Sequence, residues 1–213
     1  MKRADDPERD YARLVEDGYD RCAAAYNAAR AGKPSDELAP LFERLPQGAL
    51  VVDLGCGAGV TVAWALGSRF RVTGVDVSAA QLALARRQVP EATFVRCDMR
   101  RYDAPPASFD AVVSFYAIFH LPREEHEALF RRVHRWLRPG GLLLATLAWR
   151  DEPAYTEDGF YGVEMYRSNF GMDEYRAMLA RCRFTALDVR EAGTWAGESH
   201  PLVLAERPPS AAP

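Results

Sequence analysis

One segment constrains the fold more than any other, a short apolar run at 49–54 that leads into a cluster of glycines. It reads ALVVDLGCGAG, so that Asp53 precedes Gly55, Gly57 and Gly59. A continuous apolar run of this length is typical of a strand that is buried on both faces. Glycines directly after a strand let the backbone turn sharply and approach a ligand closely. The segment therefore predicts a strand, a ligand-binding turn and then a helix that ends near residue 67.

The same alternation of strand and helix continues along the chain. Further strands are predicted at 71–76, 93–96, 109–115 and 142–147. Helices are predicted at 78–88, with Ser78 as cap, and at 123–137, where the sequence PGG at 139–141 stops the helix. Upstream, an amphipathic helix is expected at 11–30 and a short one at 35–44, capped by Ser35 or Asp36. This order predicts an α/β fold, a parallel sheet with helices on both faces.

Sheets of this kind bind ligands beyond the carboxyl ends of their strands, which draws attention to the residues that follow each strand. The glycine turn has the spacing G-x-G-x-G with an acid before it, and not the dinucleotide spacing G-x-G-x-x-G. By itself the turn fits S-adenosylmethionine (SAM), a dinucleotide, or a tight turn without a ligand.

Two further acids follow the next two strands. Asp76 comes 23 residues after Asp53 and could accept hydrogen bonds from a ribose diol, or it could cap the helix near Ser78. Asp98 could accept a hydrogen bond from an adenine amino group while Met99 packs on the purine face, or it could be a plain loop acid.

Four segments in order carry a resemblance to a known family. They read VVDLGCGAG, VTGVDVSAAQLALAR, FVRCDMRRYDAPPASFDAVVSFYAIFHLP and LFRRVHRWLRPGGLLLATL. Together, over residues 51–147, they resemble the class I SAM-dependent methyltransferases, and more narrowly the small bacterial methyltransferase-domain enzymes. The resemblance implies a Rossmann-like seven-stranded sheet whose last strand is antiparallel. Residues 183–190 and 201–205 would supply strands six and seven.

The resemblance also implies SAM as the cofactor and a role for each motif. Gly55, Gly57 and Gly59 would hold the methionine part of SAM, with Asp53 near its amino group. Asp76 would hold the ribose, and Asp98 with Met99 would hold adenine. The other expected cofactor contacts are Cys56, Val77, Gln81, Cys97, Phe115 and Tyr19.

Residues 114–120 follow the fourth strand and would face the methyl group. The sulfonium leaves as a neutral group, so positioning should dominate, and alignment can contribute roughly 7–11 kcal/mol. His120 is the candidate base, since an ordinary pKa near 6.5 suits that role. It could instead be a helix-entry histidine or touch the cofactor only. Tyr116 is the second catalytic candidate and a candidate substrate contact.

Residues 149–170 form the expected substrate lid, a long loop on the ligand face. Six of its 22 residues are aromatic, although the aromatic content of the chain, 11%, predicts two or three. Aromatic walls exclude water and stack on flat or cationic ligands. Trp149, Tyr161 and Tyr166 are therefore candidate substrate contacts, although some of these rings could merely pack the lid onto the sheet.

Two more segments could reach the ligand. The turn at 191–200 carries Trp195, Glu198 and His200, of which His200 is the candidate substrate contact. The helix at 11–30 carries Tyr11, Tyr19 and Tyr26 and could cover SAM or simply pack against the domain. The chain 1–213 is therefore divided as one domain, with an N-terminal helical cover (1–46), a SAM-binding core (47–148), a lid (149–170) and a C-terminal helix with strands six and seven (171–207).

Composition narrows the partners. The net charge is −3, so nucleic acid is a poor expectation, and the Asx-Pro-Pro-aromatic motif of enzymes that methylate DNA amino groups is missing after the fourth strand. No apolar run reaches roughly 18 residues and no signal peptide is seen, so no membrane partner is expected. The four cysteines are scattered, which favours free thiols in the cytoplasm over a zinc site. No metal is expected.

The sequence thus predicts a cytoplasmic enzyme, monomer or homodimer, that transfers a methyl group from SAM to O or N of a small metabolite, aromatic or amphipathic. A nicotinamide-dependent oxidoreductase is the first alternative, and it would want G-x-G-x-x-G and a catalytic Tyr/Lys set. A non-catalytic SAM-binding regulator is the second, and the intact glycine loop and the aromatic lid argue against it.

Overall fold

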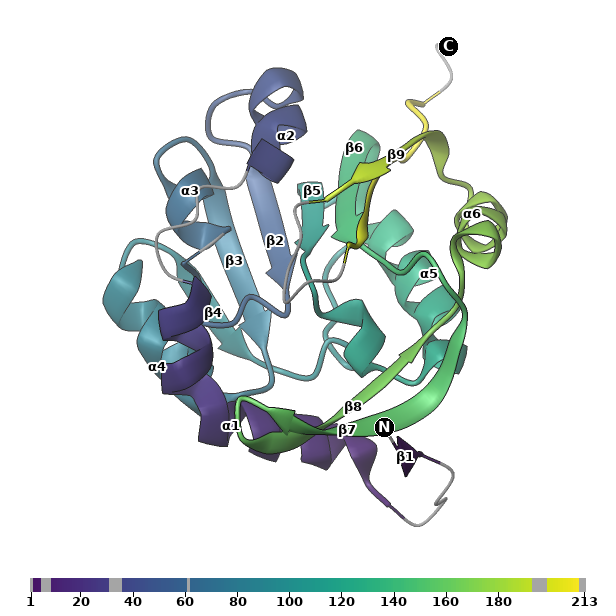
Figure 1. Ribbon diagram of the computed structural model, residues 1–213. Coiled ribbons are helices and arrows are strands. Elements are labelled where there is room, and N and C mark those ends of the chain that lie inside the picture. Colours follow the sequence, from purple (N-terminus) through teal and green to yellow (C-terminus); the bar gives the residue numbers. More distant parts are fainter. Residues whose placement is uncertain (1, 5–8, 31–35, 61, 193–198, 211–213) are drawn as a thin grey trace.

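The computed structural model describes residues 2–4, 9–30, 36–60, 62–192 and 199–210. A seven-stranded sheet in the order β4–β3–β2–β5–β6–β10–β9 forms its centre (Figure 1). The parallel strands are β2 (Leu50–Leu54), β3 (Arg71–Asp76), β4 (Thr93–Arg96), β5 (Phe109–Ser114) and β6 (Leu137–Thr146). The last strand, β10 (Pro201–Glu206), runs antiparallel to β6 and to β9 (Thr185–Glu191). The predicted sheet, with its antiparallel last strand, is confirmed.

Helices cover both faces of this sheet, and the alternation of side chains along β2 shows why. Val51 packs in a core with α2 (Ala39–Arg44) and α3 (Ala63–Gly67). Val52 and Leu54 point the other way, into a core with α5 (His126–Trp136) and α6 (Met172–Arg181). Successive residues of a strand face opposite sides, so an unbroken apolar run serves a strand that is buried on both.

The helix α4 (Ala79–Gln88) begins as expected. Ser78 is its N-cap, and the Ser78 Oγ accepts a hydrogen bond of 3.1 Å from the backbone N–H of Gln81. The upstream cap is different. The segment before α2 is a 3-10 turn, η1 (Asp36–Leu38), and α2 is capped by Leu38 without a side-chain hydrogen bond. Ser35, the other predicted cap, lies outside the described residues.

The expectation of a long loop at 149–170 is wrong. The segment forms an antiparallel hairpin of β7 (Glu152–Phe160) and β8 (Val163–Asn169), and β1 (Lys2–Arg3) adds a third strand to it. Tyr161 and Gly162 join the strands with φ angles of 48° and 84°, the pattern of a tight hairpin turn. Many positions of β7 carry polar side chains, so its alternation is weak as a strand signal.

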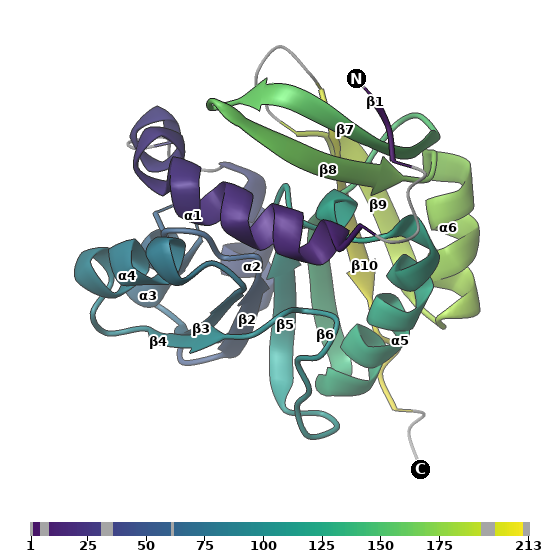
Figure 2. The same cartoon turned by 90° about the horizontal axis from the view of Figure 1, so that it is seen from below.

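The helix α1 (Tyr11–Arg30) lies alongside this hairpin and crosses the ligand end of the sheet (Figure 2). A third core joins the two, with Val15 and Cys22 from α1 and Val163, Met165 and Tyr166 from β8. The hairpin and α1 are therefore packed as one unit above the sheet.

Two boundaries around α5 also differ from the prediction. A 3-10 turn, η3 (Arg123–Glu125), precedes α5, and another, η2 (Ile118–His120), follows β5. The strand β6 starts at Leu137 and not at 142, because Leu137 already pairs with Phe109. The glycines at 140 and 141 therefore lie inside β6, where the β5–β6 register shifts between Phe109 and Ala111, and Gly140 adopts a φ of 80°.

Candidate functional site

An open cavity lies at the carboxyl ends of β2 to β5, beneath α1. It encloses about 1050 Å³, including its open mouth. Thirteen of the predicted site residues line it: Tyr19, Asp53, Gly55, Cys56, Gly57, Asp76, Val77, Cys97, Asp98, Met99, Phe115, Tyr116 and His120.

The glycine turn forms one wall and depends on its glycines. Gly55, Gly57 and Gly59 have φ angles of 75°, 53° and 73°, which L side chains rarely adopt. A Cβ on Gly55 would lie 2.3 Å from the Cβ of Ala117, so the turn also needs the space. The N–H groups of Gly55 and Cys56 both donate to the Val75 carbonyl, at 2.8 and 3.1 Å, which holds the turn against the end of β3.

Asp53 lies beneath this turn and is nearly inaccessible, with 2% of its surface exposed. Its Oδ2 has no hydrogen-bond partner among the described residues. Burial raises the pKa of Asp53 to about 8, and the nearby Asp76 carboxylate adds to the shift. A buried acid without a partner, at the wall of a cavity, is suited to a cationic group of a ligand.

Asp76, at the end of β3, is held by backbone groups on both of its oxygens. The Gly57 N–H donates to Oδ2 at 2.8 Å and the Ser78 N–H donates to Oδ1 at 2.9 Å. Burial raises the pKa of Asp76, and these backbone hydrogen bonds partly offset that effect. The carboxylate therefore has a fixed orientation toward the cavity and acceptor capacity left for a ligand diol.

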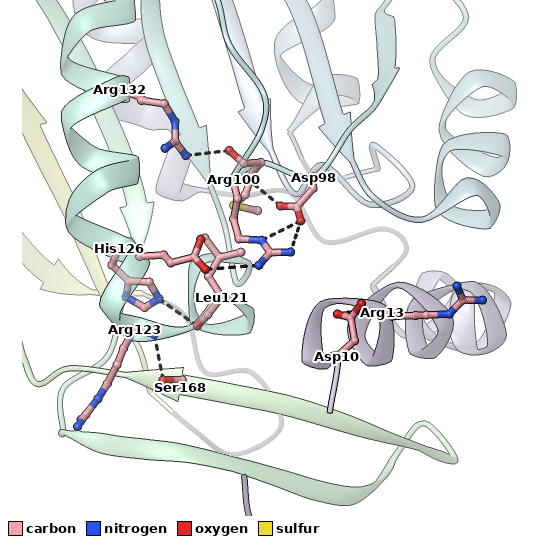
Figure 3. Close-up of polar contacts among 11 residues, drawn as sticks. Asp10, Arg13, Asp98, Arg100, Leu121, Arg123, His126, Arg132 and Ser168 are labelled. Atoms are coloured by element: carbon pink, nitrogen blue, oxygen red, sulfur yellow. Dashed lines mark hydrogen bonds and ion pairs between the residues drawn. The ribbon is translucent and has the colours of Figure 1, made fainter. Parts of the chain in front are cut away.

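The loop after β4 brings Asp98 and Met99 to the cavity wall, with the Met99 side chain close to the glycine turn. It starts from Cys97, whose N–H donates to the Asp76 carbonyl at 2.9 Å. Asp98 faces Arg100 in this loop, and Arg132 of α5 reaches the Met99 carbonyl from outside at 3.2 Å (Figure 3).

His120 lies at the inner end of the cavity, where it meets α1 and β8. Its Nδ1 is 2.8 Å from the Tyr166 carbonyl, which accepts only, so Nδ1 carries the proton. The Nε2 atom then accepts a hydrogen bond of 2.8 Å from the Tyr19 hydroxyl. Burial, and then the charge of Arg167, lower the pKa of His120 to about 3. The expected pKa near 6.5 is therefore wrong, and the imidazole is a neutral, weak base at physiological pH.

Tyr116 stands at the sharp turn after β5. Its φ of 55° is unusual for a residue with a side chain, and such strain is common where a functional site fixes the backbone. The Tyr116 hydroxyl donates to Glu37 Oε1 at 3.3 Å, so the ring leans toward η1 and borders the cavity with one side.

The predicted aromatic contacts in and before the hairpin lie farther from the cavity than expected. Trp149 is 42% exposed and lies off the described cavity wall, because it precedes β7 at the rim of the sheet. Tyr166 is buried against Tyr11, with ring centroids 4.7 Å apart, and only its carbonyl meets His120. Tyr161 packs on Tyr26 at 5.5 Å and on Phe160 at 5.0 Å, one ring away from the cavity.

Three further predicted residues, His200, Gly59 and Gln81, are not among the residues that line the cavity. His200 stacks on Phe119 with centroids 5.5 Å apart. Gly59 lies one residue from the lining residues Ala58 and Val60. Gln81 is 1% exposed, and neither polar atom of its amide has a partner among the described residues. Trp195 and Glu198 lie outside the described residues.

Sequence reasoning missed two polar lining residues. Asn27 of α1 has a buried Oδ1 without a partner among the described residues, and Arg100 pairs with Asp98. The helical spacing of Ala12, Val15 and Tyr19 could have signalled which face of α1 covers the cavity. Nothing in the sequence pairs Arg100 with a particular acid.

Two kinds of feature are absent from the described residues. No group of three or more His, Cys, Asp or Glu side chains is placed to hold a metal ion in this part of the chain. None of the described helices combines the length and apolar character that a membrane crossing needs.

Comparisons with known proteins agree with this geometry. A family model described as "Methyltransferase domain" matches residues 51–141. A methyltransferase, GfsG, of Streptomyces halstedii is 30% identical over 190 residues, which cover 83% of this chain and 67% of that protein. A trans-aconitate 2-methyltransferase of Azoarcus sp. (strain BH72) is 37% identical over 120 residues, 54% of this chain and 46% of that protein. The match with the latter thus spans about half the length of that relative.

A solved structure has the same fold over nearly the whole chain. It is the 1,6-didemethyltoxoflavin-N1-methyltransferase of Burkholderia thailandensis, with bound 1,6-didemethyltoxoflavin and S-adenosylhomocysteine. The TM-score is 0.72 at 23% identity, and the alignment covers 97% of this chain and 94% of that one.

Proposed function

The chain belongs to the class I SAM-dependent methyltransferases, and from this we propose that it transfers the methyl group of SAM to O or N of a small metabolite, aromatic or amphipathic. The observation that carries the proposal is the joint position of three acids. Asp53, Asp76 and Asp98 lie at or just beyond the carboxyl ends of three neighbouring parallel strands and line one cavity. A ligand with an ammonium group, a ribose diol and an adenine matches these three carboxylates in turn.

Each group of residues in the site would bind a different part of SAM or the acceptor. Asp53 and the glycine turn would hold the amino acid end of SAM, Asp76 the ribose, and Asp98 with Met99 the adenine. The acceptor would enter between η2 and α1, where Tyr19, Tyr116 and His120 line the cavity. His120, as a neutral imidazole, would hold the Tyr19 hydroxyl, whose oxygen would orient a hydroxyl or amine by accepting its hydrogen bond, and positioning would supply most of the rate.

A binding experiment tests the cofactor. Isothermal titration of SAM and S-adenosylhomocysteine into the wild type should give micromolar affinity on the order of 1–100 μM, and Asp76→Ala should weaken both ligands at least about tenfold, because it removes hydrogen bonds to a charged group. Asp188→Ala, which removes an exposed acid of β9, is the matched control and should bind normally. Binding of NADH in place of both ligands would contradict the proposal.

An activity experiment tests the acceptor. SAM is incubated with the protein and sets of phenols, aromatic amines and aliphatic acids, and the release of S-adenosylhomocysteine is measured. Release that depends on a phenol or an aromatic amine supports the proposed acceptor class. Release with aliphatic acids alone would show the class to be wrong, and binding without any turnover would favour a regulator that does not catalyse.

A further inference from the structure

The acids at the ends of β3 and β4 differ in what holds them. Asp76 is held by the backbone N–H groups of Gly57 and Ser78, which form the turn itself. Asp98 is held mainly by a side chain, because Arg100 Nε and Nη2 both donate to Asp98 Oδ2, at 2.8 and 2.5 Å. The orientation of the Asp98 carboxylate therefore depends on Arg100 in a way that has no counterpart at Asp76.

The hydrogen bonds that Asp98 accepts from Arg100 leave part of its acceptor capacity unused. An ionised carboxylate has about four acceptor positions, two on each oxygen. The two Arg100 donors occupy Oδ2, and the backbone N–H of Arg100 takes one position on Oδ1 at 2.8 Å. One position on Oδ1 is left, on a residue that lines the cavity.

Arg100 is itself fixed and lies in the wall of the cavity. Its Nη1 is 3.4 Å from Glu125 Oε1, at the start of α5, and its side chain is 24% exposed. Arg132 holds the same loop at the Met99 carbonyl, which Figure 3 shows next to the Asp98–Arg100 pair. A paired, two-donor contact with this little exposure keeps its geometry better than an exposed ion pair does.

We propose that Arg100 is a positioning residue for the cofactor, which fixes Asp98 so that its one remaining acceptor position meets the 6-amino group of the purine. The cavity thereby prefers adenine to a purine without that group. The inference rests on the proposed function, since it assumes that the ligand is SAM.

The test compares two ligands on matched variants. S-adenosylhomocysteine and its purine analogue without the 6-amino group are titrated into the wild type, Arg100→Gln, Arg100→Lys and Arg101→Gln. The wild type should prefer the amino ligand by roughly tenfold or more, the size of a hydrogen bond to a charged group. In Arg100→Gln this ratio should fall to within about threefold, because only the affinity for the amino ligand drops.

The other variants separate positioning from structure. Arg101 is exposed in the same loop, so Arg101→Gln should keep the wild-type ratio. Arg100→Lys keeps the charge but not the two-donor geometry, so it should lose most of the preference for the amino ligand. It takes the place of Arg100→Gln in the test if that variant does not fold. An unchanged ratio in both Arg100 variants, or an equal loss for both ligands, would overturn the inference. A wild type that binds neither ligand would instead overturn the proposed function, and the inference with it.

Discussion

At the scale of single residues, the most consequential group is Asp53. It is almost fully buried, its Oδ2 has no partner among the described residues, and its pKa is raised to about 8 by burial. At neutral pH the free protein therefore holds Asp53 mostly as the neutral acid. A ligand ammonium group favours the ionised form, so that binding must remove a proton.

This predicts a proton release on binding of SAM. The free protein loses the proton only above a pH of about 8, so the affinity for SAM should rise as the pH increases from 6 to 8 and level off above that. Titration calorimetry at pH 7, in buffers of different ionisation enthalpy, should show a release that approaches one proton per site. Asp53→Asn cannot ionise and is the control, with no release from this position. A wild type that releases no proton would contradict the assignment of Asp53.

The sequence predicted the positions of the acids but not the state of every group. Asp53, Asp76 and Asp98 were predictable because each is adjacent to the end of a strand with a clear pattern. The pKa of His120 was not, since it depends on burial beneath α1 and on the charge of Arg167, which β8 brings close. Contacts between segments about 50 to 100 residues apart leave no local pattern.

At the scale of elements, the strands of the sheet were more predictable than the segments above it. The run that became β2 is apolar and leads into the glycine turn, whereas β7 carries polar residues at many positions. The hairpin is stabilised by its packing on α1, through Met165 and Tyr166, and not by a strong strand signal of its own. Its turn at Tyr161 and Gly162 was the local signal that could have revealed it.

The attachment of α1 to the rest of the site leads to a prediction. Asp20 of α1 accepts hydrogen bonds from the Ser78 Oγ at 2.5 Å and from the Ala80 N–H at 3.0 Å, at the start of α4. Asp20→Asn should lower the free energy of unfolding by about 1 kcal/mol and weaken SAM binding, because α1 covers the cavity. Asp17→Asn, on the exposed face of α1, is the control for thermal unfolding and titration. Equal effects in the two variants would contradict this role of Asp20.

At the scale of the whole molecule, a buried histidine connects the two helices that cover one face of the sheet. His126 of α5 stacks on Tyr175 of α6, and its Nε2–H donates to the Leu121 carbonyl at 3.3 Å (Figure 3). Burial lowers the pKa of His126 to about 4. His126 is therefore neutral in the folded protein, where α5 and α6 pack on this face of the sheet.

This predicts a specific loss of stability in acid. Because the pKa of His126 is below the ordinary 6.5, the unfolded chain binds the proton first, and the contribution of His126 is lost as the pH falls from 6.5 toward 4. Urea unfolding at pH 7, 6 and 5 should show a higher free energy of unfolding for the wild type than for His126→Asn. This difference should become smaller as the pH falls. Asp53, whose raised pKa changes the stability with pH in the opposite direction, is present in both proteins, so its contribution cancels in the difference. A difference that stays constant from pH 7 to pH 5 would contradict the lowered pKa of His126.

The third core, between α1 and the hairpin, has a consequence for how such an enzyme could acquire a new acceptor. Tyr11 and Tyr166 face each other across it, and Arg9 pairs with Glu164 beside it. The helix that covers the cavity and the hairpin packed against it come from distant parts of the chain yet share one interior, so a graft of either alone would expose half of that interior. Chimaeras between related enzymes should therefore exchange α1 and β7–β8 together, with the sheet and its three acids left unchanged.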